Sequence, residues 1–281
     1  MSGGTASASS SGDRKTRPSD AVVEQRRQDI LDHVIEEGEA RIDDLTSKFK
    51  VSLMTMHRDL DDLAERRLLR KLRGRVEAYP ALTIESAARF RDTLHHGEKE
   101  ALGQAAANHV LPGQTVFVDD STTLLPLVKR LAEIDALTVV TNSLHAARLL
   151  GPRVEVVLAG GRYSHEYDSC AGPEVLNLLD SIRADVSFVS VTAVAVGRLF
   201  HPDRDYAELK KAALRVANQT VLVVDHSKFG RTATYAHGDV GDYDLLITGQ
   251  ATPTEEIEAA LNAGTAIEIV EHVAEGQPYD S

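Results

Sequence analysis

The sequence predicts an α/β protein in two parts, a small N-terminal helical domain and a larger domain built on a mostly parallel sheet. Helical hydrophobic periodicity dominates residues 20–80. Beyond residue 113, short β-branched apolar runs alternate with helix-like stretches, which is typical of a parallel sheet covered by helices. The length of 281 residues is compatible with one large domain or two smaller ones.

Composition narrows the functional classes. Aromatic residues make up 5% of the chain and Trp is absent, which disfavours stacking platforms for single strands. Cys170 is the only cysteine, so we expect no internal disulfide. The adjacent His95 and His96 point different ways on a helix, and we expect neither a metal ion nor a cofactor. Residues 1–19 indicate a disordered tail rather than a signal peptide. With no apolar run of 18 residues, a cytoplasmic protein without membrane contact is expected.

Charge is distributed unevenly along this acidic chain. The net charge is −12, yet RRLLRKLRGR (residues 66–75) holds six cations and no carboxylate. Overall acidity argues against nonspecific coating of nucleic acid, but it leaves room for a local basic face.

The first expected element is a helix between Ser19, a possible N-cap, and Gly38, a possible C-terminal stop. Its predicted inward stripe is Val23, Ile30, Leu31 and Val34. Two further helices follow, with a tight break at Lys50-Val51. The shorter one is expected to bury Leu45 and Phe49.

The longer helix is expected to start after Ser52, a good N-cap. Its predicted inward stripe is Leu53, Met56, Leu60 and Leu63, and its first turns present Met54, Thr55, His57 and Arg58 outward. Two helices joined by a short turn, the second exposing its N-terminal half, predict a helix-turn-helix that enters the major groove.

The basic stretch can then form a hairpin turning near Arg73-Gly74. Such a wing would bring Arg70, Lys71, Arg73 and Arg75 to the phosphate backbone or the minor groove. The simpler alternative is a solvated helix end with loose charges. Because the helix pair and the cations adjoin, residues 20–80 are interpreted as a winged helix-turn-helix DNA-binding domain.

Residues 81–98 predict a helical linker, and residues 99–275 predict an α/β effector-sensing domain. The strands are expected at 114–119, 137–141, 154–160, 186–191, 220–225, 244–249 and 266–270. The helices after an Ala-rich first one are expected at 124–133, 144–150, 173–182, 206–218 and 253–263. In such sheets, ligands bind beyond the carboxyl ends of the strands.

Polar residues gather at these expected strand ends. Ser121, Thr122 and Thr123 could cradle a phosphate, although hydroxyl residues are also common helix caps. Other strand ends and one helix start supply Thr141, Asn142, Ser143, Gly160, Gly161, Lys210, Asp225, Ser227 and Lys228. Several convergent polar ends with two lysines favour an anionic polar ligand over ordinary turn chemistry.

The first half resembles the N-terminal domain of the DeoR family of bacterial transcription regulators. The shared features are the RRQDIL opening, IDDL…FKVS, T-hydrophobic-x-RDL and a basic, Gly-containing wing. We expect phosphate contacts from Ser52, Thr55 and Arg58, and base-edge contacts from Leu53, Met54 and His57. The family usually has two arginines where this chain has His57-Arg58, and His-Gly-Gly where it has Leu72-Arg73-Gly74, so the operator sequence does not transfer.

The second half resembles the sugar-sensing domain of the same family and is also similar to ribose-5-phosphate isomerase. The matching stretches include EKEALGQAAANHVLPGQTVFVDDSTT, LTVVTNSLHAARLL, ELKKAALRVA and VLVVDHSKFG. The resemblance implies that phosphate is held by Lys99, Ser121, Thr122 and Thr123, and that the sugar site is lined by Asp119, Asn142, Lys210 and Lys228. Two departures are Asp120, an extra negative charge in the loop, and Ala193, where a glycine is common.

The sequence therefore favours a transcriptional regulator, a repressor of sugar-metabolism genes that a phosphorylated sugar releases from operator DNA. It would act as a homo-oligomer, a dimer or a tetramer. The alternative is an isomerase-like sugar-phosphate enzyme with an appended DNA-binding domain. An isomerase needs an acid/base pair, and the isomerase resemblance would supply acidic residues after the fourth strand. Residues 186–197 hold no carboxylate, so we expect no enzyme.

Overall fold

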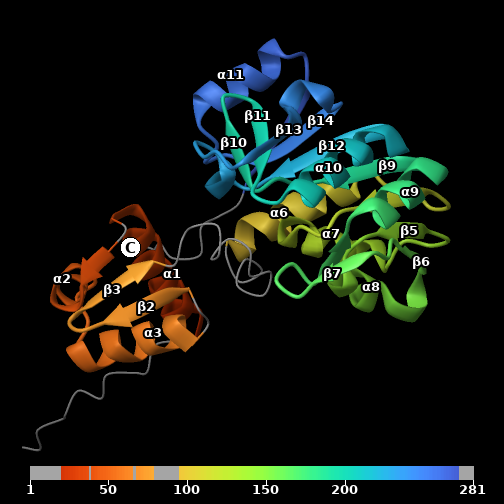
Figure 1. The fold of residues 1–281 in the computed structure, drawn as a ribbon. Helices are drawn as coiled ribbons and strands as arrows, with labels where there is room; N and C mark the ends of the chain where they lie inside the picture. The colour runs from red at the N-terminus through yellow and green to blue at the C-terminus, as the bar shows by residue number, and fades with distance from the viewer. Residues whose placement is uncertain (1–19, 38, 66–67, 79–94, 272–281) are drawn as a thin grey trace, which may run out of the picture. The chain divides into compact units, whose positions relative to one another are not determined.

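The computed structural model describes residues 20–37, 39–65, 68–78 and 95–271 (Figure 1). The chain divides into two compact units, residues 1–81 and 82–281, and each is described by itself. The expected tail, most of the expected linker and the possible caps Ser19 and Gly38 lie outside the described residues. The end of that linker forms the first turn of a helix that continues through Lys99.

The described part of unit 1 combines three helices with a three-stranded antiparallel sheet. The helices are α1 (Asp20–Glu37), α2 (Ile42–Lys48) and α3 (Leu53–Glu65). The strands are β1 (Glu39–Arg41), β2 (Leu69–Leu72) and β3 (Arg75–Ala78), in the order β1-β3-β2. The predicted hairpin is confirmed as β2 and β3, and Gly74 in its turn has φ +77°, a conformation that glycine adopts without strain.

The two helices and the break between them agree with the prediction, but Phe49, expected to be buried, is half-buried because it lies at the C-cap of α2. Lys50, between α2 and α3, adopts a left-handed φ of 51°, which breaks the helix. The Ser52 hydroxyl oxygen accepts a hydrogen bond from the backbone N–H of Thr55 at 3.2 Å, so Ser52 caps α3 as expected. The prediction that Leu53 faces inward is wrong. Its side chain is 49% exposed, because the packed stripe of α3 begins one turn later, at Met56.

A buried ion-pair cluster joins α1 to α3. Asp59 is 2% exposed, and its two carboxylate oxygens accept hydrogen bonds from Arg26 at 2.8 Å and from Arg27 at 3.1 Å. Arg27 also lies 3.1 Å from a carboxylate oxygen of Asp62. The arginines of the RRQDIL opening and the aspartate of the RDL motif are therefore partners inside the domain.

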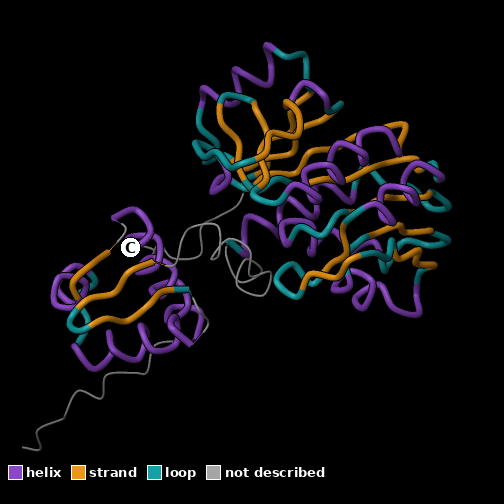
Figure 2. Tube along the Cα trace, viewed as in Figure 1, coloured by secondary structure: helices purple, strands orange, loops and turns teal. Residues whose placement is uncertain are grey.

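Unit 2 is built on a seven-stranded sheet in the order β15-β14-β12-β9-β4-β5-β6, shown as the orange layer between helices in Figure 2. All neighbouring strands run parallel. The strands are β4 (Thr115–Val118), β5 (Thr138–Thr141), β6 (Glu155–Leu158), β9 (Ala184–Val189), β12 (Ala217–Val224), β14 (Leu245–Gly249) and β15 (Ala266–Val270). Each of the seven predicted strands is confirmed. Because all are parallel, their carboxyl ends lie along one edge of the sheet.

Helices cover both faces of this sheet, and the sheet separates two apolar clusters, one on each face. They are α6 (His96–Ala107), α7 (Leu125–Leu131), α8 (Leu144–Leu150), α9 (Pro173–Ser181), α10 (Arg204–Val216) and α11 (Thr254–Asn262). Successive side chains of β4 point to opposite faces of the sheet. Val116 and Val118 belong to the cluster that includes side chains of α6 and α7, whereas Phe117 belongs to the cluster that includes side chains of α9 and α10. Lys210 lies in the middle of α10, not at the start of a helix as expected.

Short antiparallel strands that the sequence analysis missed complete unit 2. They are the pair β7 (Arg162–Ser164) and β8 (Ser169–Ala171), and the three-stranded sheet of β10 (Ala193–Ala195), β11 (Arg198–His201) and β13 (Tyr235–Asp239). Each is only three to five residues long, which is too short for hydrophobic periodicity to predict a strand from the sequence. No helix in the described part of the chain is both long and apolar enough to cross a bilayer.

Candidate functional site

The N-cap residue and the N-terminal half of α3 present the six side chains expected to meet DNA. Ser52 and Arg58 are exposed, and Thr55 and His57 are half-buried. Leu53 and Met54 are 49% and 67% exposed, whereas Met56 is fully buried. Two large apolar side chains at the accessible start of a helix suit contact with thymine methyl groups in the major groove.

The four wing cations differ in their partners. Arg70 pairs with Glu77 across the hairpin, Lys71 lies 2.5 Å from Asp61, and Arg75 lies 3.1 Å from Glu39. Within the described ranges, Arg73 has no such carboxylate partner and is exposed beside the Gly74 turn. The charge of the wing is thus partly compensated inside unit 1, and Arg73 is its free cation among the described residues.

In unit 2, the loop after β4 is organised by its own side chains. The Asp119 carboxylate accepts a hydrogen bond from the backbone N–H of Ser121 at 2.9 Å. The Ser121 hydroxyl accepts one from the N–H of Thr123 at 3.3 Å and so caps the short helix η1 (Thr122–Leu124). The helix-cap alternative for this hydroxyl is therefore correct for Ser121, and two N–H groups of the loop are occupied by oxygens of the loop itself.

Asp225, which follows β12, lies near two lysines, Lys99 and Lys228, and contacts the hydroxyl of Thr123. Lys99, which is 3% exposed, donates from Nζ to the Thr122 hydroxyl at 3.3 Å. The Thr123 hydroxyl donates to Asp225 at 3.0 Å. Burial alone would raise the pKa of Asp225, but the charges of Lys228 and Lys99 outweigh it and hold the pKa well below its usual range. Asp225 therefore keeps its negative charge between the two lysines.

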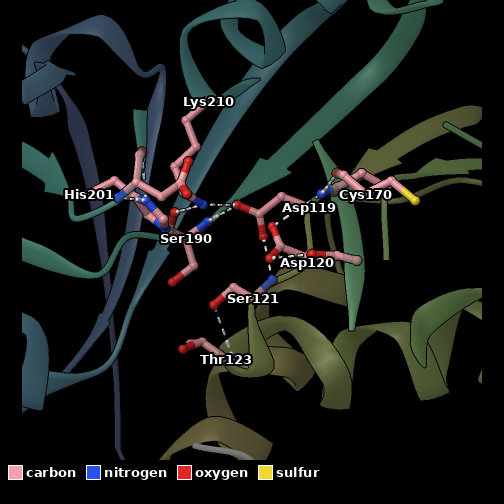
Figure 3. Close-up of polar contacts among 11 residues, drawn as sticks. Asp119, Asp120, Ser121, Thr123, Cys170, Ser190, His201 and Lys210 are labelled. Atoms are coloured by element: carbon pink, nitrogen blue, oxygen red, sulfur yellow. Dashed lines mark hydrogen bonds and ion pairs between the residues drawn. The ribbon is translucent and has the colours of Figure 1, made fainter. Parts of the chain in front are cut away.

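A second buried pair lies on the side of α10 (Figure 3). Lys210 donates from Nζ to Asp119 Oδ2 at 2.6 Å and to the backbone carbonyl of Ser190 at 2.8 Å. The backbone N–H of Ser190 donates to the same carboxylate at 3.0 Å. Burial raises the pKa of Asp119, and the Lys210 ammonium opposes this effect. This triangle ties the ends of β4 and β9 to α10.

Asp120 is held on the side of β5 and β8. Its oxygens accept hydrogen bonds from Asn142 Nδ2 at 3.3 Å and from the Ser169 hydroxyl at 3.1 Å. Asn142 Nδ2 also donates to the backbone carbonyl of Cys170 at 3.0 Å, whereas Asn142 Oδ1 is buried without a hydrogen-bond partner in the described structure. The extra charge of Asp120 is thus met by neighbouring donors, and Asn142 keeps an unused acceptor.

A cluster of two histidines and a glutamate lies next to Lys99. Glu98 Oε1 accepts a hydrogen bond from the backbone N–H of His226 at 3.0 Å, and Glu98 Oε2 lies 2.6 Å from His226 Nδ1. The rings of His95 and His226 are 4.6 Å apart in an edge-on arrangement. The hydrogen bond to Glu98 raises the pKa of His226, and burial lowers that of His95 to about 4.

The eight effector residues expected from the sequence are thus supplied by α6, the loop after β4, η1, the end of β5, α10 and η3 (His226–Lys228). Six are buried, whereas Ser121 and Lys228 are half-buried. Sequence reasoning missed Ser190 and Glu98 as their neighbours. Ser190 directly follows β9, so the strand-end rule could have found it, whereas no local signal marks Glu98.

Two family models match this chain. Residues 94–250 match the model described as the DeoR C terminal sensor domain, and residues 26–80 match the DeoR-like helix-turn-helix domain.

Similar proteins include bacterial regulators. The chain is 32% identical over 231 residues to a protein of Escherichia coli K12 named as an uncharacterized HTH-type transcriptional regulator, YgbI, covering 82% of this chain and 91% of that one. It is 27% identical to the glycerol-3-phosphate regulon repressor of the same organism, covering 87% and 98%. Ribose 5-phosphate isomerase A from Methanocaldococcus jannaschii superposes with a TM-score of 0.35 at 18% identity, covering 47% of this chain and 53% of that one.

Proposed function

Because this chain belongs to the DeoR family of transcriptional regulators, we propose that it represses sugar-metabolism genes and that a phosphorylated sugar releases it from operator DNA. The observation that carries this proposal is the convergence of Lys99, Lys228 and the loop hydroxyls at the carboxyl edge of the sheet. Ammonium and hydroxyl donors at that edge suit a phosphate. The name of the glycerol-3-phosphate regulon repressor, a relative of similar length, points to the same ligand class.

The site divides into a phosphate part and a sugar part. Lys99, Lys228 and the hydroxyls of residues 121–123 serve the phosphate, while Asp119, Asn142 and Lys210 serve the sugar hydroxyls. Asn142 Oδ1 and Ser190 Oγ support this division, since both are buried and neither has a hydrogen-bond partner among the described residues. Buried polar atoms are rarely left unpaired, and hydroxyl groups of a sugar would supply the missing bonds.

Control of DNA binding follows from linkage between the two sites. A ligand that binds better to the arrangement with low DNA affinity shifts the population away from the operator. A coupling free energy of ~1–3 kcal/mol changes DNA affinity roughly 5–150-fold. The chain would bind paired half-sites as a dimer or tetramer in the cytoplasm, as helix-turn-helix proteins commonly do.

The ligand acts as an effector in this proposal and is not turned over. Residues 190–197, beyond the end of β9, carry no carboxylate that could serve as the base of an isomerase. Steady conversion of a pentose or hexose phosphate by the purified protein would contradict this assignment.

The test uses the full chain bound to its own promoter fragment and follows fluorescence anisotropy during addition of phosphorylated sugars. We expect one of them to release the DNA selectively. Lys99→Ala should bind DNA as the wild type does but respond far less to that sugar. Lys129→Ala, which removes an exposed lysine of α7, should respond normally. Failure of every phosphorylated sugar, or a normal response of folded Lys99→Ala, would contradict the proposed site.

A further inference from the structure

Unit 2 holds a group of potential metal ligands that the effector site does not use. His95 immediately precedes α6, Glu98 lies in the first turn of that helix, and His226 begins η3 after β12. One candidate ligand atom from each lies within 4.8 Å of the other two. The fold thus brings together side chains that are 128 residues apart in sequence.

We propose that His95, Glu98 and His226 bind a divalent transition-metal ion, with Zn²⁺ as the best match. Two imidazoles and one carboxylate are a ligand set that Zn²⁺ accepts, and hard cations such as Mg²⁺ or Ca²⁺ prefer oxygen ligands alone. Tetrahedral bonds of ~2.0–2.2 Å place ligand atoms ~3.4 Å apart. The present spacing therefore requires a modest contraction, which rotation of the half-buried His95 ring can supply.

The carboxylate is already fixed in position. Glu98 is 1% exposed, and the backbone N–H of His226 donates to its Oε1. The chain packs so closely here that a Cβ on Gly249 would lie 2.2 Å from the same oxygen. A buried carboxylate that is already held in place beside an imidazole needs little rearrangement to bind a cation, so the free-energy cost of preparing the site is small.

The two histidines provide access for the ion, since both are half-buried, unlike Glu98. Nearby charges also permit a cation: the carboxylates of Glu98 and Asp225 offset the ammonium groups of Lys99 and Lys228. Three protein ligands leave one position of a tetrahedral ion open. A water molecule or an oxygen of a bound anion would fill it, so the ion would lie beside the proposed phosphate position.

The neighbouring histidine gives a matched control. His96 follows His95 directly, but its side chain is 66% exposed and lies 3.9 Å from Glu100 rather than in the cluster. The expectation from sequence that the two rings point different ways is therefore correct. The expectation that neither residue serves a metal is what this proposal revises, because the partners of His95 come from η3 and not from its own neighbour.

The test is titration of the untagged, chelator-treated full chain with Zn²⁺ alone, measured by isothermal calorimetry. Co²⁺ serves as a second probe, because its visible absorption reports tetrahedral coordination. We expect one tight site per chain and an increase in melting temperature with Zn²⁺. His226→Gln, Glu98→Gln and His95→Asn, the last chosen because asparagine tolerates the left-handed φ of 51° at this position, should each weaken that site at least tenfold.

His96→Asn should bind Zn²⁺ as the wild type does. Variants are compared only where circular dichroism shows the wild-type fold in metal-free buffer, and any one folded ligand variant suffices. A wild type without a tight site, or ligand variants that keep it, would overturn the proposal. Zn²⁺ binding is measured without any sugar or DNA, so its failure is distinguishable from failure of the proposed regulatory function.

Discussion

Lys210 and Asp119 form a buried ion pair, with 2.6 Å between the ammonium nitrogen and Oδ2 and almost no exposure of either side chain. The pair connects the middle of α10 to the end of β4 across 91 residues of sequence. It is therefore both a structural link of unit 2 and part of the proposed sugar site.

Removing one partner should leave an uncompensated buried charge. Lys210→Met is expected to lower the free energy of unfolding of unit 2 by ~3–5 kcal/mol, because Asp119 then lacks its counter-ion. Adding Asp119→Asn to that variant should recover part of the loss. Urea unfolding of the full chain, followed by circular dichroism, measures both. A loss below ~1 kcal/mol, the value for an exposed pair, would contradict the buried role of the pair.

Asp59 should matter for the stability of unit 1 and not for DNA contact. Asp59→Ala removes the carboxylate that Arg26 and Arg27 share. We therefore expect the free energy of unfolding of unit 1 to fall by ~3–5 kcal/mol. Asp61→Ala is the control, since its 66% exposed side chain should contribute at most ~1 kcal/mol. Calorimetric melting of the full chain tests the difference, and equal effects of the two variants would argue against the cluster.

The ion pairs of the wing predict opposite effects of two substitutions on DNA binding. Arg73→Ala should weaken binding to all sequences alike and lower the slope of log affinity against log salt by about 1, because it removes a free cation. Glu77→Gln should strengthen binding, since it releases Arg70 from its partner. Anisotropy titrations at several salt concentrations distinguish them. An unchanged salt slope in Arg73→Ala would place this arginine away from DNA.

Two glycines of α6 should respond differently to alanine. A Cβ on Gly103 would lie 2.6 Å from Pro126 Cβ and 2.7 Å from the backbone nitrogen of Leu127, so Gly103→Ala should force α6 and α7 apart and cost ~1–3 kcal/mol. No atom lies within 4 Å of a Cβ on Gly97, and Gly97→Ala should stabilise by ~0.4–1 kcal/mol. Denaturant midpoints compare the two. A stabilising Gly103→Ala would show that the helices are not packed this closely.

His237 should make unit 2 sensitive to acid. It is 2% exposed, and burial, with Lys210 and Lys211 nearby, lowers its pKa to about 3. An unfolded histidine has a pKa of ~6.5, so between these values the unfolded chain binds more protons and stability falls as the pH drops below ~6.5. The loss attributable to this residue is roughly 2 kcal/mol by pH ~5.

Replacing this ring with one that does not titrate tests that assignment. His237→Phe should lose less stability than the wild type between neutral and mildly acidic pH, as measured by urea unfolding at each pH. His165→Phe, at an exposed position, should behave as the wild type does. If His237→Phe keeps the full acid sensitivity, other groups cause it.

Local sequence was sufficient for the elements whose hydrogen bonds and periodicity are local. The cap at Ser52, the turn at Gly74 and the seven β-branched runs are each encoded within a few residues, and each was predicted. The parallel arrangement of those runs also fixed which polar strand ends share one edge of the sheet. That is why the effector residues could be named before their contacts were known.

Only the tertiary structure decided which of these side chains pair with one another. That Asp119 meets Lys210, that Thr123 meets Asp225 and that His226 meets both Glu98 and His95 depends on segments that are 91 to 131 residues apart. Whereas β7 with β8 and β10 with β11 pair across short local connections, the pairing of β13 with β11 likewise joins separate segments of the chain. Such contacts form when the packed core closes long loops, and their free energy comes from burial and shared hydrogen bonds, so no local pattern of residues records them.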